Sequence, residues 1–440
     1  MSTRTNMSSR ALAVAALLAL AAACGGDGDG DERRTSRQPS EAPAASEEPP
    51  AATAFATDAA FSIETGPVRH PPVALHRQNA WVADETGLTM VDLATGKDVT
   101  RLKPERRPLH EAWQDPLGRP DEDEAAELEQ QGAQRRLPRP LLARIGGTQA
   151  VVAAVPVRGQ RQDLAVEILA ANAETGERLW RLLVEPEVLA DESAAKLSAP
   201  VLHAHDGKAV VQVAKDDRIL GSLGVDLDEP KLVWEREDFL AMAGSGDELA
   251  GMSFRDGGGI RVLGAMLADG EPTWSEDSSK YASIAPCGPW LAFEDFEDEK
   301  GPRLVEVGSG EVTHTRDDGL VSGMSCWEGE GGTTVVLAAS DESDGDDGSD
   351  KGGEERGGAI GLDTAGGKVL WQLPSEEWEG EVSASYEDRL YLKTGEGLAV
   401  RDARTGEVLG KAPGIAPQQV NGYAGLVAAG NGVDVHPADR

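Results

Sequence analysis

Three cysteines are the residues of this chain best suited to covalent chemistry, because a thiol can be acylated or oxidised to a disulfide. Cys24 follows a short apolar segment near the N-terminus, whereas Cys287 and Cys326 lie 39 residues apart in the second half of the chain. The settings differ, so the sequence predicts two different fates for these thiols.

Cys24 ends a segment with the layout of a secretion signal. Arg4 and Arg10, with no acidic residue near them, precede 13 apolar residues at 11–23. That length is too short to span a bilayer and is typical of a signal peptide. The sequence Leu-Ala-Ala-Ala-Cys-Gly at 20–25 resembles a bacterial lipobox. The resemblance implies that Cys24 becomes a lipidated N-terminus, which anchors the protein on the extracytoplasmic face of the cell membrane. A plain secretion signal is the alternative.

The residues after Cys24 have the composition of a tether. Residues 24–57 are mostly Gly, Asp, Glu, Ser, Pro and Ala, so they cannot form a core. We therefore expect a signal peptide at 1–23, a lipidated, disordered tether at 24–57 and a folded domain at 58–437. A flexible coil of about 30 residues spans roughly 30 Å, enough to hold the domain just off a membrane.

Other reactive residues give weaker signals. His203 and His205 would share one face of a strand, but no third metal ligand accompanies them, and ordinary histidines are the favoured interpretation. The acidic segment 341–357 lacks the ligand spacing of an EF-hand loop. The sequence also contains no G-x-S-x-G, H-E-x-x-H or P-loop motif. We expect no catalytic residue, no metal and no cofactor.

The overall charge excludes some partners. The formal net charge is −35 at pH 7, and so acidic a surface repels nucleic acid and anionic lipid headgroups. We expect no nucleic-acid partner, and membrane attachment through lipid rather than through basic patches.

A short sequence repeat occurs seven times along the chain, and the structure that it builds must hold the residues discussed above. An apolar strand leads to an Asp-like residue, a Gly follows four residues later, and a Trp often follows four residues after that. The central positions are Gly96, Gly176, Pro230, Gly270, Gly310, Gly367 and Gly406. The matching Asp and Trp positions include Asp92, Trp180, Asp226, Trp234, Trp274, Asp363, Trp371 and Asp402. In the turn, Asp caps backbone N–H groups and Gly takes a positive φ.

The spacing of this repeat predicts the fold. Several centres lie about 40 residues apart, and the longer gaps contain segments without strand patterns, at 103–139 and 341–357. A period near 40 is typical of a β-propeller with four strands per blade. The first segment reads as a loop with a short helix at 121–131; a degenerate blade hidden there is the alternative.

Ring closure is expected to join the two ends of the chain. Ala60–Glu64 is a strand before the first full unit, and three strands within 418–436 follow the last. Together they would complete an eighth blade and remove the exposed sheet edges of an open array. The prediction is an all-β, eight-bladed propeller of four-stranded antiparallel blades, with seven blades as the alternative.

The repeat resembles the tryptophan-docking repeat of pyrroloquinoline-quinone-type propellers, and the copy at Ala170–Trp180 matches that pattern best. This group includes quinone-dependent dehydrogenases, sensor domains and the β-barrel-assembly lipoproteins, to which the chain is similar. The dehydrogenases carry neighbouring cysteines and a calcium-binding cluster, which are not evident here. We expect a non-catalytic module that binds or scaffolds an envelope protein. A small-ligand sensor is the first alternative, and a quinone-dependent oxidoreductase is the second.

Cys287 and Cys326 are separated by one repeat. Each is expected to end the first strand of its blade, at 283–287 and 321–326, and first strands converge on the propeller axis. Exported proteins meet oxidising conditions, so a disulfide between neighbouring blades is expected. Two unrelated buried thiols are the alternative.

Overall fold

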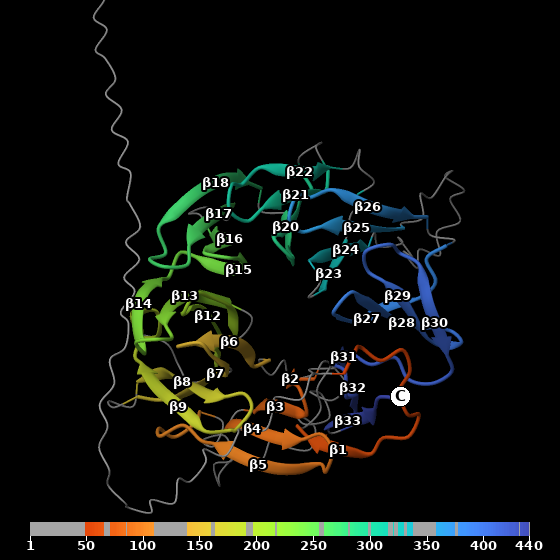
Figure 1. Ribbon diagram of the computed structural model, residues 1–440. Coiled ribbons are helices and arrows are strands. Elements are labelled where there is room, and N and C mark those ends of the chain that lie inside the picture. The colour runs from red at the N-terminus through yellow and green to blue at the C-terminus, as the bar shows by residue number, and fades with distance from the viewer. Residues whose placement is uncertain are drawn as a thin grey trace, which may run out of the picture. The chain divides into compact units, whose positions relative to one another are not determined.

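Short apolar runs separated by turn residues form eight antiparallel sheets, arranged as blades around a central axis (Figure 1). The computed structural model describes residues 49–65, 71–84, 86–109, 139–159, 163–190, 197–215, 218–254, 259–279, 282–297, 301–315, 320, 324–329, 332–337, 358–374, 377–430 and 432–439. The predicted eight-bladed propeller is therefore confirmed, and the seven-bladed alternative is wrong.

Blades 1 to 4 follow one another along the chain, and each runs as a meander from the innermost to the outermost strand, except that the innermost position of blade 3 is shared by two strands that pair with the same neighbour, so that this sheet has five strands. Blade 1 comprises β2 (Val73–His76), β3 (Asn79–Asp84), β4 (Gly87–Asp92) and β5 (Lys97–Leu102), and blade 2 comprises β6 (Leu141–Ile145), β7 (Thr148–Arg158), β8 (Leu164–Asn172) and β9 (Arg178–Val184). A 3-10 helix, η2 (Glu187–Leu189), leads to blade 3, which comprises β10 (Leu197–Ser198), β11 (Val201–His205), β12 (Lys208–Lys215), β13 (Arg218–Asp226) and β14 (Lys231–Arg236). Blade 4 comprises β15 (Leu240–Ser245), β16 (Glu248–Phe254), β17 (Ile260–Met266) and β18 (Pro272–Ser278).

Blades 5 to 7 repeat this order, and blade 8 combines strands from both ends of the chain. Blade 5 comprises β19 (Ala282–Cys287), β20 (Trp290–Asp295), β21 (Arg303–Glu306) and β22 (Val312–Thr315), and blade 6 comprises β23 (Ser325–Gly329), β24 (Thr333–Leu337), β25 (Ala359–Asp363) and β26 (Val369–Leu373). Blade 7 comprises β27 (Glu381–Tyr386), β28 (Arg389–Thr394), β29 (Gly397–Asp402) and β30 (Val408–Ala412), and blade 8 comprises β31 (Gln419–Val420), β32 (Ala424–Ala429), β33 (Gly432–Pro437) and β1 (Phe61–Glu64).

Blade 8 closes the ring as predicted. Strand β1 pairs antiparallel with β33, with Phe61 opposite Val435 and Glu64 opposite Gly432, and Figure 1 shows the two strands side by side. The N-terminal strand thus supplies the outer strand that the three C-terminal strands lack. With β1 in place blade 8 has four strands, and the ring is closed.

The core lies between the blades rather than inside any one of them. Along β8, Val166 and Ile168 pack toward blade 3, whereas Ala165 and Leu169 pack toward blade 1. Alternate side chains of a strand point to opposite faces, so a middle strand must be apolar at nearly every position to fill both interfaces. Blade 1 packs directly on blade 2, so no further blade stands between them in the ring; most of residues 103–139, for which a degenerate blade was the alternative, lie outside the described residues.

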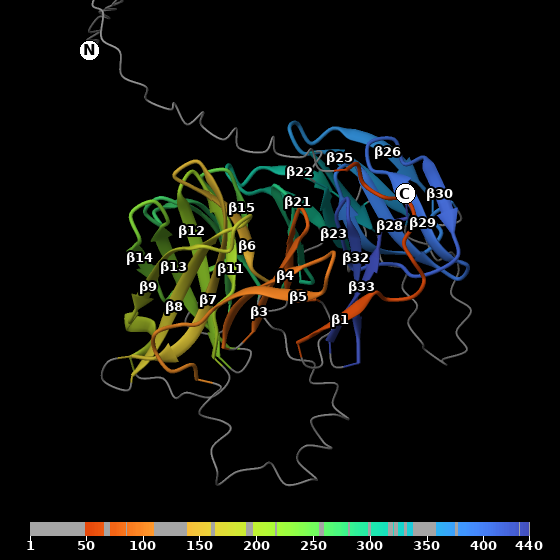
Figure 2. The same cartoon turned by 60° about the horizontal axis from the view of Figure 1, so that its bottom comes forward.

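Two faces of the ring differ in their connections (Figure 2). In each meander, the first-to-second and third-to-fourth turns lie on one face, here called the turn face. The second-to-third and blade-to-blade connections lie on the other, the loop face. By this order, the ends of the flanking strands place the β5–β6 connection and the β24–β25 connection, in which the two expected insertions fall, at the loop face. The short helix expected at 121–131 and all of 341–357 lie outside the described residues.

Two boundaries differ from the sequence prediction. Residues 49–57 were expected in the disordered tether, yet Ala51, Ala52 and Phe55 are buried against blades 7 and 8. The folded part therefore begins before residue 58. The first strand of blade 6 is Ser325–Gly329 rather than 321–326. The signal peptide, Cys24 and the tether up to residue 48 lie outside the described residues.

Candidate functional site

The third-to-fourth turns are built by the Asp and Gly of the repeat. Asp92 Oδ1 accepts hydrogen bonds from the N–H groups of Ala94 and Thr95, at 2.8 and 2.9 Å. Asp402 holds its own turn in the same way, at 2.8 Å to both donors. The glycines that end these turns, Gly96, Gly176, Gly270, Gly310, Gly367 and Gly406, have φ between 64° and 75°. Branched side chains resist that conformation, which is why the glycine recurs.

Asp226 has an additional partner. Its carboxylate accepts hydrogen bonds from the N–H groups of Asp228 and Glu229, and it forms a 2.9 Å ion pair with Lys208 on the neighbouring strand. Burial opposes ionisation, but these hydrogen bonds and the ammonium group together hold the pKa of Asp226 below its ordinary value. This turn ends in Pro230 instead of Gly.

Three of the repeat tryptophans join their blade to the next one. The indole Nε1 donates to a backbone carbonyl in the following blade: from Trp234 to Leu267 at 2.9 Å, from Trp274 to Val307 at 2.9 Å, and from Trp371 to Ala403 at 2.8 Å. Each ring also lies against the turn glycine of that blade, Gly270, Gly310 or Gly406, where an added Cβ would press on the indole. Trp180 differs, because its buried Nε1 has no hydrogen-bond partner.

A second glycine makes room for each of these rings. Gly224, Gly264 and Gly361 lie on the third strand directly opposite Trp234, Trp274 and Trp371. A Cβ at any of them would overlap the indole. Sequence reasoning missed these positions, although the signal is present as a Gly ten residues before the Trp.

Blades without an outer tryptophan use other side chains for the same link. In blade 1, Trp81 on the second strand donates from Nε1 to the Ala173 carbonyl at 3.0 Å. In blade 7, Tyr391 at the matching place on β28 donates from Oη to the Ala52 carbonyl at 2.7 Å, and burial raises its pKa. In blade 5, His314 Nε2 lies 2.6 Å from the Gly367 carbonyl. His314 occupies the Trp position of the repeat, four residues after Gly310, whereas sequence reasoning did not identify Trp81 or Tyr391.

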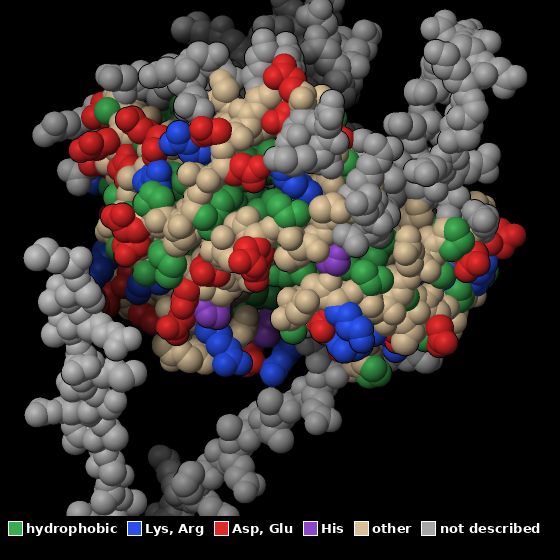
Figure 3. Space-filling model, turned by 90° about the horizontal axis from the view of Figure 1, so that it is seen from above, with side chains coloured by type: hydrophobic (Ala, Val, Ile, Leu, Met, Phe, Trp, Pro, Cys, Tyr) green, Lys and Arg blue, Asp and Glu red, His purple; other side chains and the backbone are tan. Residues whose placement is uncertain are grey.

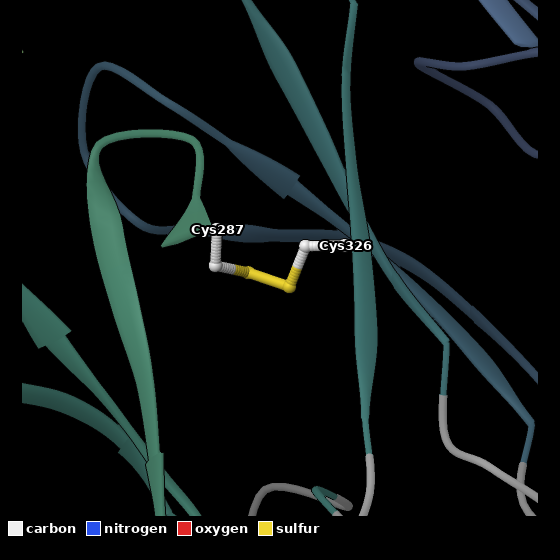
Figure 4. The surroundings of a disulfide bond; sticks show 2 residues. All are labelled: Cys287 and Cys326. Carbon is white, nitrogen blue, oxygen red and sulfur yellow. A yellow bond between two sulfur atoms is a disulfide. The ribbon is translucent and has the colours of Figure 1, made fainter. Parts of the chain in front are cut away.

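Cys287 and Cys326 form a disulfide between blades 5 and 6, with their Cα atoms 5.0 Å apart. Figure 4 shows the bond bridging two neighbouring strands. Cys287 is the last residue of β19 and is fully buried, whereas Cys326 is the second residue of β23. The two cysteines thus pair, but not from matching strand ends as the repeat suggested. The bond crosses the same junction of blades 5 and 6 at which His314 contacts the Gly367 carbonyl.

The outer strands are protected from pairing with another sheet. In blades 1 to 7 the register between the third and fourth strands shifts at the residue before the Trp position, so that residue bulges out. Bulged residues include Val99, Leu179 and Val233, which are exposed. Figure 3 looks onto the outer side of the ring, where hydrophobic side chains are scattered among acidic ones. Bulges disrupt edge pairing, so strand addition at these edges is disfavoured.

His203 joins two blades rather than standing free. Its Nε2 lies 2.9 Å from the Gly246 carbonyl of blade 4, and its ring packs against Gly244. Burial lowers the pKa of His203. His205 is exposed. Within the described ranges, no group of three or more His, Cys, Asp or Glu side chains is arranged to hold a metal ion, and no helix is long and apolar enough to cross a membrane.

Asp295 holds the connection between blades 4 and 5 on the loop face. Its carboxylate accepts hydrogen bonds from the Ser278 hydroxyl, from the hydroxyl and N–H of Ser279, and from the Glu297 N–H, at 2.6–3.0 Å. Burial alone would raise the pKa of Asp295, but these four bonds hold it well below its ordinary value.

We expect Asp295→Asn to destabilise the fold in a pH-dependent way. Because the folded-state pKa is depressed, the ionised carboxylate stabilises the fold above pH ~4, and this contribution is lost as the pH falls. The variant should lose about 1–3 kcal/mol at neutral pH through unsatisfied donors. In urea unfolding, its deficit should narrow below pH ~4. The exposed Asp98→Asn serves as the control; a deficit of Asp295→Asn that is constant from pH 7 to pH 2 would contradict this account.

Comparisons with known proteins add structural neighbours. No protein-family model and no curated protein sequence match the chain. Its structure is similar to that of BamB from Moraxella catarrhalis, at 12% identity and a TM-score of 0.41, covering 86% of this chain and 99% of BamB. It is also similar to the Dos1 propeller, at 10% identity and a TM-score of 0.37, covering 82% and 75% of the two chains. The β-propeller domain of the Trilobed protease from Pyrococcus furiosus has 12% identity and a TM-score of 0.36, covering 62% and 84%. At these identities and scores, nothing about activity or partners follows for this chain.

Proposed function

We propose that this protein is a lipid-anchored, extracytoplasmic propeller that binds or scaffolds an envelope protein and has no catalytic role. The observation that carries the proposal is the lipobox-like sequence ending at Cys24, followed by a tether and then by a closed ring. Lipid would hold the ring at the membrane, and the tether would let its surfaces meet a partner.

The construction of the ring supports a binding role. The repeat residues form the turns and the hydrogen bonds between blades, so their role is structural. Bulges disfavour strand addition at the outer edges of blades 1 to 7, so we expect side chains rather than edge pairing to recognise a partner. Loops displayed on a rigid scaffold are where propellers and similar folds commonly carry function. The net charge of −35 disfavours nucleic acid as that partner.

Cys24→Ala should move the protein from the membrane to the soluble fraction. Acyl chains contribute about 0.8 kcal/mol per buried CH₂, so two or more chains make a stable anchor that the variant lacks. Fractionation of cells, with a high-salt wash of the membranes, measures the change. Ser46→Ala, a substitution in the same tether, is the matched control and should stay in the membrane. Cys24→Ala protein retained through the salt wash would contradict the anchor.

Two further measurements separate the proposed role from the alternatives. Cross-linking of the wild-type protein in membranes, followed by purification, should recover a discrete protein partner, whereas a small-ligand sensor could yield none. Mixing the purified protein with pyrroloquinoline quinone and calcium should leave the quinone absorbance unchanged. A saturable spectral change would instead favour the oxidoreductase.

A further inference from the structure

The ring contains one place where a third-to-fourth turn is not continuous chain. In blade 8, the third strand β33 ends near the C-terminus, and the fourth strand β1 starts near the N-terminus. Residues 49–56 fill this place. Phe55 forms a β-bridge with Ala438, the Ala56 N–H donates to the Pro437 carbonyl at 2.9 Å, and the Asp439 N–H donates to the Ala54 carbonyl at 3.0 Å. Non-covalent contacts therefore replace the covalent turn found in the other blades.

Three side chains of blade 7 hold the backbone of this segment. Arg389 donates to the Ala51 carbonyl, Tyr391 Oη donates to the Ala52 carbonyl at 2.7 Å, and Glu387 Oε2 accepts from the Ala51 N–H at 3.3 Å. The Phe55 ring is only 4% exposed, and its centroid lies 5.9 Å from that of Tyr391. The Tyr391 bond matches the one that Trp81 makes to the Ala173 carbonyl, so the segment takes the place of a docking turn.

We propose that residues 49–56 act as a latch whose release opens the ring first between β1 and β33. Strand β1 has only four paired residues, Phe61–Glu64, and no covalent turn ties it to β33. Its attachment thus depends on the contacts made just before it in the chain. The chain continues from this segment toward Cys24, so a partner or force that pulls on the N-terminal part of the chain acts directly on the latch and on the β1–β33 pairing. The inference concerns the fold itself and does not depend on lipidation.

The double variant Arg389→Ala/Tyr391→Phe tests the latch in the full-length protein. It removes two hydrogen bonds to the segment while leaving every β1–β33 pair unchanged. The rate of chymotrypsin cleavage after Phe55, followed by mass spectrometry, reports opening of the latch. The rate of hydrogen exchange at the β1 and β33 amides reports separation of these two strands. Both rates should rise at least tenfold relative to wild type, with exchange in β16 and β17 of the opposite blade 4 unchanged.

Trp81→Phe is the matched control, because it removes the equivalent link where the turn is continuous chain. In this variant the rate of amide hydrogen exchange should rise in blades 1 and 2, while cleavage after Phe55 and exchange in β1 and β33 stay at wild-type rates. Faster cleavage after Phe55 without faster exchange in β1 and β33 would make the segment a passive attachment and overturn the latch. An unchanged double variant, or a uniform rise in all eight blades, would also overturn it.

Discussion

Trp371→Ala is expected to lower the free energy of unfolding by about 3–5 kcal/mol, the range for truncating a buried Trp. The indole fills the junction between blades 6 and 7, where it donates to the Ala403 carbonyl and lies against Gly406. It also stacks on Trp378, with ring centroids 6.1 Å apart. Truncation leaves a cavity and an unpaired carbonyl at once. Urea unfolding followed by circular dichroism measures the loss.

Two control variants in the same blade separate this effect from general sensitivity. Val369→Ala changes an exposed residue on the same strand and should cost less than about 0.5 kcal/mol. Deleting residues 341–357 should leave the thermal midpoint nearly unchanged, since Leu337 and Ala359 already pair at the base of that connection. If Trp371→Ala is tolerated as well as the deletion, the docking role of the tryptophan is wrong.

Loss of the Cys287–Cys326 disulfide is expected to destabilise the ring by about 4 kcal/mol. The bond closes a loop with a sequence separation of 39 residues, and the chain-entropy estimate for a loop of that size is about 4 kcal/mol. Its removal also leaves the junction of blades 5 and 6 with His314 as its docking side chain. The measurement is the urea midpoint of the wild-type protein with and without reductant.

The double variant Cys287→Ser/Cys326→Ser supplies the control for reduction. Without reductant it should unfold at the midpoint of the reduced wild-type protein, and reductant should not change it further. A wild-type midpoint that does not respond to complete reduction, verified by thiol titration, would show that the bond adds no stability.

The fold could be predicted because the residues that build it repeat. The left-handed turn conformation selects Gly, and its capping selects Asp, so Asp402 and Gly406 mark a turn without any knowledge of distant contacts. The order of turns then counts the blades. Ring closure was also predictable, because an incomplete set of strands at one end of the chain matched a single strand, Phe61–Glu64, at the other.

The links that replace missing tryptophans could not be predicted, because their partners are distant in sequence. Trp81 and Tyr391 look like ordinary strand residues, and only the neighbouring blade shows that each reaches a turn carbonyl. The folded conformation of residues 49–57 could not be predicted for a related reason. Its composition is that of a tether, but the hydrogen bonds that hold its backbone come from Arg389 and Tyr391 of blade 7, which are far away in the sequence.

The mass of the N-terminal peptide, from protein purified out of membranes, tests the central proposal most directly. The account predicts that the peptide begins at Cys24 and carries the added mass of at least two acyl chains. A peptide that begins at another residue, or one that begins at Cys24 without lipid, would contradict the proposed anchor and with it the placement of this propeller at the membrane.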